Sequence, residues 1–115
     1  KSDLALRLIK HAGAILVSDD RTDIEIKGGK VYGRTPHTIA GLLEVRGIGI
    51  QKVSYVEEVE IKLVVELKKT YQEISRLPQK EFYNFEGTKL PMIKLYPFEA
   101  SAPDKIVIKL DSMVD

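Results

Sequence analysis

Two pairs of polar residues in this sequence are of the types that handle phosphate groups. Lys1 and Ser2 precede an apolar pattern with helical spacing, and an acidic pair follows the apolar run 14–17. In a phosphate-binding loop, a lysine reaches the β and γ phosphate oxygens, and the hydroxyl group that follows it binds Mg²⁺ at the start of a helix. Considered alone, a lysine and a serine before a helix more often form a solvated helix N-terminus with the serine as N-cap than a phosphate-binding loop. For this chain, that alternative makes Ser2 the N-cap.

Asp19 and Asp20 form the acidic pair, and their position favours a ligand site. In open α/β sheets, ligands bind beyond the carboxyl ends of the strands, where the start of a helix and a strand that ends in aspartate converge. We therefore expect Lys1 and Ser2 to meet one of these two carboxylates. One carboxylate can hold Mg²⁺ while its neighbour accepts a hydroxyl proton. The alternative is a solvated acidic turn.

The segment 44–49 is a third candidate. Gly47 and Gly49 leave the backbone free to approach a ligand, and Glu44 and Arg46 could supply a metal ligand and a phosphate partner. The competing interpretation is a helix that ends at Gly47, with Arg46 near the negative end of the helix dipole.

The composition restricts the class of protein. The chain has 115 residues, 18 Lys and Arg against 17 Asp and Glu, two histidines and no cysteine. This length suits one core, so we expect a single domain over residues 1–115. Disulfide scaffolds and thiolate metal sites are excluded, and two histidines argue against a multi-histidine metal site. The balanced charge argues against nucleic-acid binding. We expect no membrane span, because no apolar run approaches about 20 residues. We also expect the protein to be cytoplasmic.

The hydrophobic pattern predicts a mixed α/β fold in which sheet predominates. Helices are predicted over residues 3–12 and 36–45, the second one started by Thr35 and Pro36. The apolar run 14–17 is typical of a central strand that is buried on both faces. Further extended segments are predicted as a hairpin over residues 23–33 and as strands over residues 48–53, 59–67, 82–85, 92–95 and 105–110, with a partly helical loop over residues 68–80.

Three segments resemble the catalytic domain of HPr kinase/phosphorylase in order and approximate spacing. They are residues 1–9 (KSDLALRLI), 16–20 (LVSDD) and 43–50 (LEVRGIGI), and weaker likeness continues at residues 71–77 and 90–93. The Glu-x-Arg-Gly-x-Gly run is highly specific to this bacterial family, which regulates carbon metabolism by phosphorylating a serine of HPr, a phosphocarrier of the sugar phosphotransferase system. The resemblance implies an α/β, P-loop kinase-like domain with a mixed sheet and an additional antiparallel β region.

The resemblance also implies a role for each candidate residue. Asp19 would be the general base toward the HPr serine in the kinase direction and the acid in the reverse reaction, and Arg76 would be a second catalytic residue. The cofactors would be ATP, or pyrophosphate, and Mg²⁺, and the protein would be a homo-oligomer, namely a hexamer. The implied cofactor-binding residues are Lys1, Ser2, Arg46, Gly47 and Gly49, and the implied Mg²⁺ ligands are Ser2, Asp20 and Glu44.

The chain also departs from the family pattern. The glycine-rich part of the phosphate loop is expected before Lys1, a flexible loop is shortened or missing near residues 55–56, and no aspartate directly precedes Arg76. The phosphoacceptor is therefore expected to be HPr or a paralogous phosphocarrier. The alternative function is a non-catalytic regulatory module that binds a nucleotide or a phosphocarrier on the same scaffold. A reaction like that of phosphoenolpyruvate carboxykinase would need further substrate-binding elements, and this chain is too short to supply them.

Overall fold

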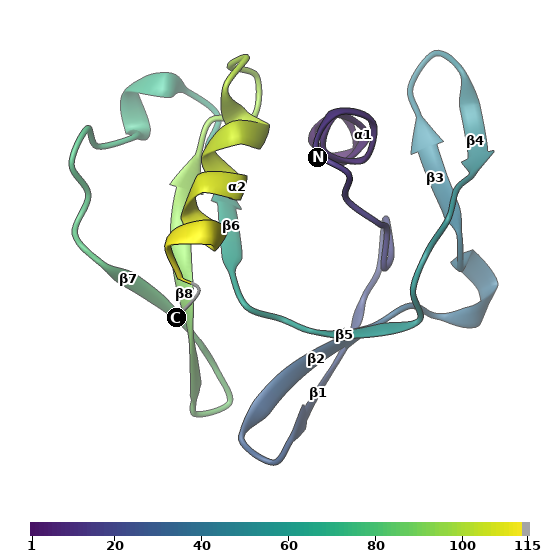
Figure 1. Ribbon diagram of the computed structural model, residues 1–115, viewed down its shortest axis with the longest axis horizontal. Coiled ribbons are helices and arrows are strands. Elements are labelled where there is room, and N and C mark those ends of the chain that lie inside the picture. Colours follow the sequence, from purple (N-terminus) through teal and green to yellow (C-terminus); the bar gives the residue numbers. More distant parts are fainter. Residues whose placement is uncertain (114–115) are drawn as a thin grey trace. The chain divides into compact units, whose positions relative to one another are not determined.

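The computed structural model describes residues 1–113, which form two compact parts (Figure 1). One part comprises residues 2–61, and the other comprises Lys1 with the residues from Lys62 onward. The elements of the first part are α1 (Ser2–His11), β1 (Asp23–Lys27), β2 (Lys30–Arg34), the 3₁₀ helix η1 (His37–Ile39), β3 (Leu42–Val45), β4 (Gly49–Lys52) and β5 (Glu58–Glu60).

α1 confirms the first predicted helix. Its first turn contains Asp3 and its last turn contains Lys10 and His11, so both ends complement the helix dipole. Gly13, with φ of +71°, follows the helix in the left-handed conformation that commonly ends one. Leu4 is the buried residue of α1, and the helix packs against β3.

Two antiparallel sheets make up the β structure of the first part. β1 and β2 form the predicted hairpin around a two-glycine turn with φ values of +57° and +78°, and β5 pairs with the other edge of β2. β3 and β4 form a separate two-stranded sheet whose Leu43 is fully buried. Val31 of β2 is also almost completely buried, so each sheet contributes to the core.

Two predictions for the first part are wrong. The run 14–17 is not a buried strand: Leu16 alone pairs, in an isolated parallel bridge with Tyr55, and Ile15 is 59% exposed. An apolar run needs partner strands on both sides to become a central strand, and among residues 2–61 it has only that bridge. The predicted helix over residues 36–45 is reduced to η1, because residues 42–45 instead satisfy their backbone groups by pairing with β4.

The second part contains a mixed three-stranded sheet. Its order is β6-β8-β7, in which β6 is parallel and β7 antiparallel to the central β8. Figure 1 shows α2 running alongside β8. The elements are β6 (Val64–Leu67), the 3₁₀ helix η2 (Tyr71–Glu73), β7 (Glu81–Phe85), β8 (Thr88–Leu95) and α2 (Ala102–Ser112).

The second part confirms the strands near residues 82–85 and 92–95 and the partly helical loop, but corrects two other predictions. Residues 59–67 are not one long strand, because β5 ends at Glu60 and β6 begins at Val64. Residues 105–110 are helical, since Pro103 occupies the first turn of α2, where proline is favoured, and Asp104 complements the dipole there. No helix in residues 1–113 has the length and apolar character to cross a bilayer.

Candidate functional site

Asp19 joins three of the segments singled out in the sequence. The Ser2 hydroxyl donates a hydrogen bond to Asp19 Oδ1 at 3.1 Å, and the backbone N–H of Glu44 donates to Asp19 Oδ2 at 3.0 Å. The expected contact between the start of α1 and the acidic pair is therefore present, and it is made by Ser2 with Asp19. The half-buried carboxylate ties the first residue of α1 to β3.

The turn that carries Asp19 is held by neighbouring hydroxyl groups. Ser18 Oγ donates a hydrogen bond to the carbonyl oxygen of Arg21, and it accepts one from the Thr35 hydroxyl at 3.3 Å. Thr35 is only 4% exposed, and its backbone N–H donates to the carbonyl oxygen of Glu57. Thr35 was expected to start a helix, whereas the structure makes it a buried support for the Asp19 turn.

Asp19 and Ser2 keep the capacity for further interactions. A carboxylate has about four lone-pair positions, so the two donors leave Asp19 able to accept a proton or another hydrogen bond. Ser2 uses its hydroxyl proton toward Asp19, which leaves the lone pairs of its oxygen available to a cation. The pair can therefore combine proton acceptance with cation binding.

Residues 44–49 form a hairpin turn, so the competing interpretation of a helix that ends at Gly47 is wrong. β3 and β4 flank a three-residue turn, which is closed by a hydrogen bond from the N–H of Ile48 to the carbonyl oxygen of Val45. Gly47 and Gly49 have φ of +88° and +115°, conformations that a residue with a Cβ rarely adopts. Arg46 is exposed at the tip of this hairpin.

The other predicted site residues occupy exposed positions. Lys1 directly precedes α1, Asp20 follows Asp19, and the side chain of Glu44 lies on β3. Arg76 belongs to the second part, in the loop between η2 and β7. The roles given to these four residues stay predictions.

The residues around Asp19 fit a magnesium ion that a substrate helps to hold. Within residues 1–113, no group of three or more His, Cys, Asp or Glu side chains could form a metal centre by itself. Mg²⁺ is commonly bound through one or two carboxylates together with waters and substrate phosphates. The hydroxyl of Ser2 and the carboxylate of Asp20, which follows Asp19 in the chain, would make a donor set of that limited kind.

Comparison with known proteins gives consistent matches over nearly the whole chain. Residues 1–109 match the family described as HPr Serine kinase C-terminal domain. The HPr kinase/phosphorylase of Clostridium beijerinckii is 47% identical over 72 residues, which cover 56% of this chain and 24% of that protein. The HPr kinase/phosphorylase of Mycoplasmopsis pulmonis is 36% identical over 106 residues, which cover 83% of this chain and 34% of that protein.

A solved structure has the same fold. The Hpr(Ser) kinase/phosphatase from Coxiella burnetii matches with a TM-score of 0.83 and 25% identity, over 97% of this chain and 79% of that chain. The chain thus spans between about a quarter and a third of the length of the two relatives described above. The match in fold extends through both parts of the chain.

Proposed function

Because this chain belongs to the HPr serine kinase C-terminal domain family, we propose that it transfers a phosphoryl group to a serine of a phosphocarrier protein. The acceptor would be HPr or a paralogous phosphocarrier, and the reaction would regulate carbon metabolism in the cytoplasm. The observation that carries this proposal is the hydrogen-bonded set of Ser2, Asp19 and the Glu44 backbone, which brings together three family-like segments.

In the forward direction, Asp19 would accept the proton of the attacking serine hydroxyl as the new O–P bond forms. The bond between the γ phosphorus and its bridging oxygen breaks in the same step, and ADP leaves. In reverse, inorganic phosphate attacks the phosphoserine phosphorus, the bond to the serine oxygen breaks, and Asp19 returns the proton to that oxygen. Pyrophosphate is then the product, which also makes it a candidate donor in the forward direction.

The other residues would bind and orient the phosphates. Lys1 would contact the β and γ oxygens, and the glycine turn that carries Arg46 would let the backbone approach them. Arg76 would be a second catalytic residue, as the resemblance implies. Mg²⁺ would be held by Ser2, Asp20 and Glu44, and when bound it would neutralise charge on the transferred group.

The decisive variant is Asp19→Asn. Asparagine keeps the shape and one acceptor oxygen but cannot take the serine proton, so phosphoryl transfer should fall by about 10² to 10⁴ in both directions. ATP affinity should change little. The measurement is transfer of labelled phosphate from ATP to HPr and back, with calorimetry of ATP binding at fixed Mg²⁺ and salt.

An HPr variant whose acceptor serine is alanine serves as the control for transfer to the correct site. Wild-type turnover in Asp19→Asn would place the base elsewhere. ATP binding without any transfer by the wild-type protein would support the non-catalytic regulatory module instead. Light scattering would test the proposed hexamer, whose mass should be six times that of one chain.

A further inference from the structure

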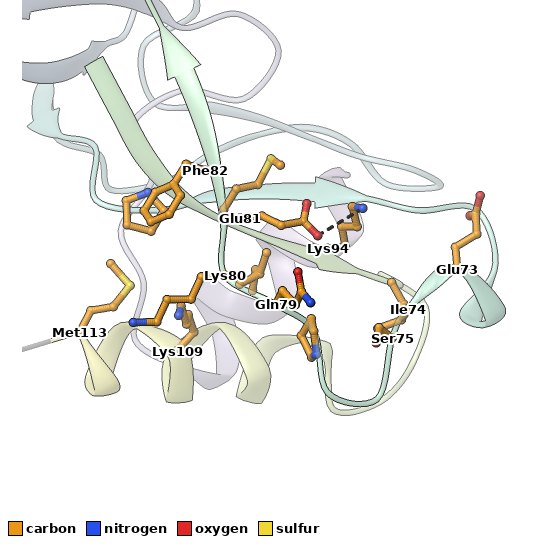
Figure 2. A pocket seen from close by; sticks show the side chains of 14 residues that line it. Glu73, Ile74, Ser75, Gln79, Lys80, Glu81, Phe82, Lys94, Lys109 and Met113 are labelled. Atoms are coloured by element: carbon orange, nitrogen blue, oxygen red, sulfur yellow. Dashed lines mark ion pairs between the residues drawn. The ribbon is translucent and has the colours of Figure 1, made fainter. Parts of the chain in front are cut away.

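A cavity of about 330 Å³ lies within the second part, and none of the residues assigned to phosphoryl transfer lines it. It is bounded by the loop that precedes β7, by the β7–β8 hairpin and by the last turns of α2 (Figure 2). Its lining includes Ile74, Pro78, Phe82, Met92 and Met113. Pockets that bind small molecules begin at about 300 Å³ and are mostly apolar, with a few polar groups that fix orientation.

Lys109 lies in this cavity at a position where a helix normally presents an apolar side chain. The inward stripe of α2 contains buried Ala102 and Ile106, and the three- and four-residue spacing continues it to Lys109 and Met113. Lys109 is less exposed than Ile108, which is 68% exposed. A cation therefore faces the cavity while an aliphatic neighbour faces outward.

The acidic residues that line the cavity already have partners. Glu81 forms an ion pair with Lys94, whose Nζ lies 3.3 Å from Glu81 Oε1 (Figure 2). The Glu73 carboxylate accepts hydrogen bonds from two backbone N–H groups at the start of η2. The carboxylates of Glu73 and Glu81 are thus already paired, and they do not neutralise the remaining lysines of the cavity.

Lys80 and Lys109 are those other cations. Both line the cavity, and no acidic side chain among residues 1–113 forms an ion pair with either of them. In Figure 2 both side chains lie toward the Met113 end of the cavity. The cavity therefore combines a partly apolar lining with two ammonium groups that form no ion pair with a carboxylate in the described part of the chain, residues 1–113.

We propose that this cavity binds a small organic anion with an aromatic or aliphatic body. The apolar body would lie between Phe82 and Met113, where burial of its surface favours binding. A carboxylate or phosphate group would interact with Lys80 and Lys109. The site shares no residue with the proposed phosphoryl-transfer site, so the two proposals can fail independently.

The chain carries suitable reporters for a test. Its only two methionines, Met92 and Met113, both line the cavity. With ¹³C-methyl methionine, NMR titrations would compare 4-phenylbutyrate with its neutral analogue 4-phenyl-1-butanol. We expect both methyl signals to shift with saturation, and the acid to bind about tenfold more tightly than the alcohol, because only the acid meets the two lysines.

A pair of double variants separates local from general charge effects. Lys80→Gln with Lys109→Gln should weaken binding of 4-phenylbutyrate about tenfold and leave the alcohol unchanged. Lys69→Gln with Lys89→Gln removes the same charge from exposed positions of the same part, outside the cavity, and should change neither affinity.

Three results would overturn the proposal. They are unshifted methionine signals, equal affinities for the acid and the alcohol, and equal weakening by the two double variants. The comparison of acid with alcohol in the wild-type chain needs no substitution, so the proposal is testable even if a variant folds poorly.

Discussion

Asp19 and Gly41 illustrate how single residues shape the first part. Asp19 accepts hydrogen bonds from two segments, whereas Gly41 allows the chain to turn into β3 with φ of +73°. A Cβ at Gly41 would lie 2.8 Å from a ring carbon of Tyr55. Position 41 thus excludes side chains both by backbone conformation and by contact.

Gly41→Ala should lower the free energy of unfolding by about 1–3 kcal/mol, because left-handed φ disfavours alanine and the Tyr55 ring must move. Gly13→Ala is the matched control: its φ is +71°, and a Cβ there would have no neighbour within 4 Å. The measurement is urea unfolding of both variants. Equal losses would show that the Tyr55 contact adds no cost.

Among the elements, α2 shows most clearly why sequence pattern alone can mislead. The alternation of Ile106, Ile108 and Leu110 fits a strand, but the same residues also permit a helix. Pro103 near the N-terminus of α2 and the burial of Ile106 favour the helix. Tertiary packing decides such cases, and the local pattern does not contain it.

Ile106→Ala should cost about 2–4 kcal/mol of unfolding free energy, because it removes methyl groups from a buried site. Ile108→Ala should be nearly neutral, since that side chain is 68% exposed. A strand would place both residues on one face and give similar losses. Denaturant unfolding of the two variants tests this, and equal destabilisation would contradict the helix.

At the end of β6, a half-buried ion pair gives a prediction about pH. Lys68 Nζ lies 2.5 Å from Glu66 Oε2, and this hydrogen bond lowers the pKa of Glu66 below its usual value. The pair therefore stabilises the folded state above the usual pKa of glutamate, and that contribution is lost as the pH falls through the lowered pKa.

Lys68→Gln should raise the pKa of Glu66 toward the usual value of a glutamate, because the main cause of its shift is removed. ¹³C NMR titration of the side-chain carboxylate measures this directly. Lys69→Gln is the control, since Lys69 is not among the causes of the shift. A Glu66 pKa that does not move in Lys68→Gln would contradict the assignment.

For the molecule as a whole, the sequence predicted the elements that depend on local signals better than those that depend on pairing between distant residues. The Gly28 and Gly29 turn marks its hairpin in the sequence, and the spacing of α1 marks its buried face. By contrast, the separation of β5 from β6 and the bridge between Leu16 and Tyr55 depend on partners distant in the chain. Such pairings leave little trace in a single sequence.

The site follows the same division. The sequence predicted, from where ligands bind in open α/β sheets, that Lys1 and Ser2 would meet Asp19 or Asp20, and the structure has the contact between Ser2 and Asp19. The use of the Glu44 backbone, and the support from buried Thr35, had no sequence signal, because main-chain donors and buried hydroxyls are selected by the folded geometry. Side-chain types are visible in a sequence, but the direction of a backbone N–H is not.

The hydrogen bond from the Glu44 amide to Asp19 also provides a spectroscopic reporter of the site. Amide resonance frequencies depend on the charge and distance of the acceptor, so the ¹H–¹⁵N signal of Glu44 should change whenever the Asp19 carboxylate gains a proton, a cation or a new partner. Occupancy of the site could then be followed at equilibrium, without turnover and without a label on the ligand.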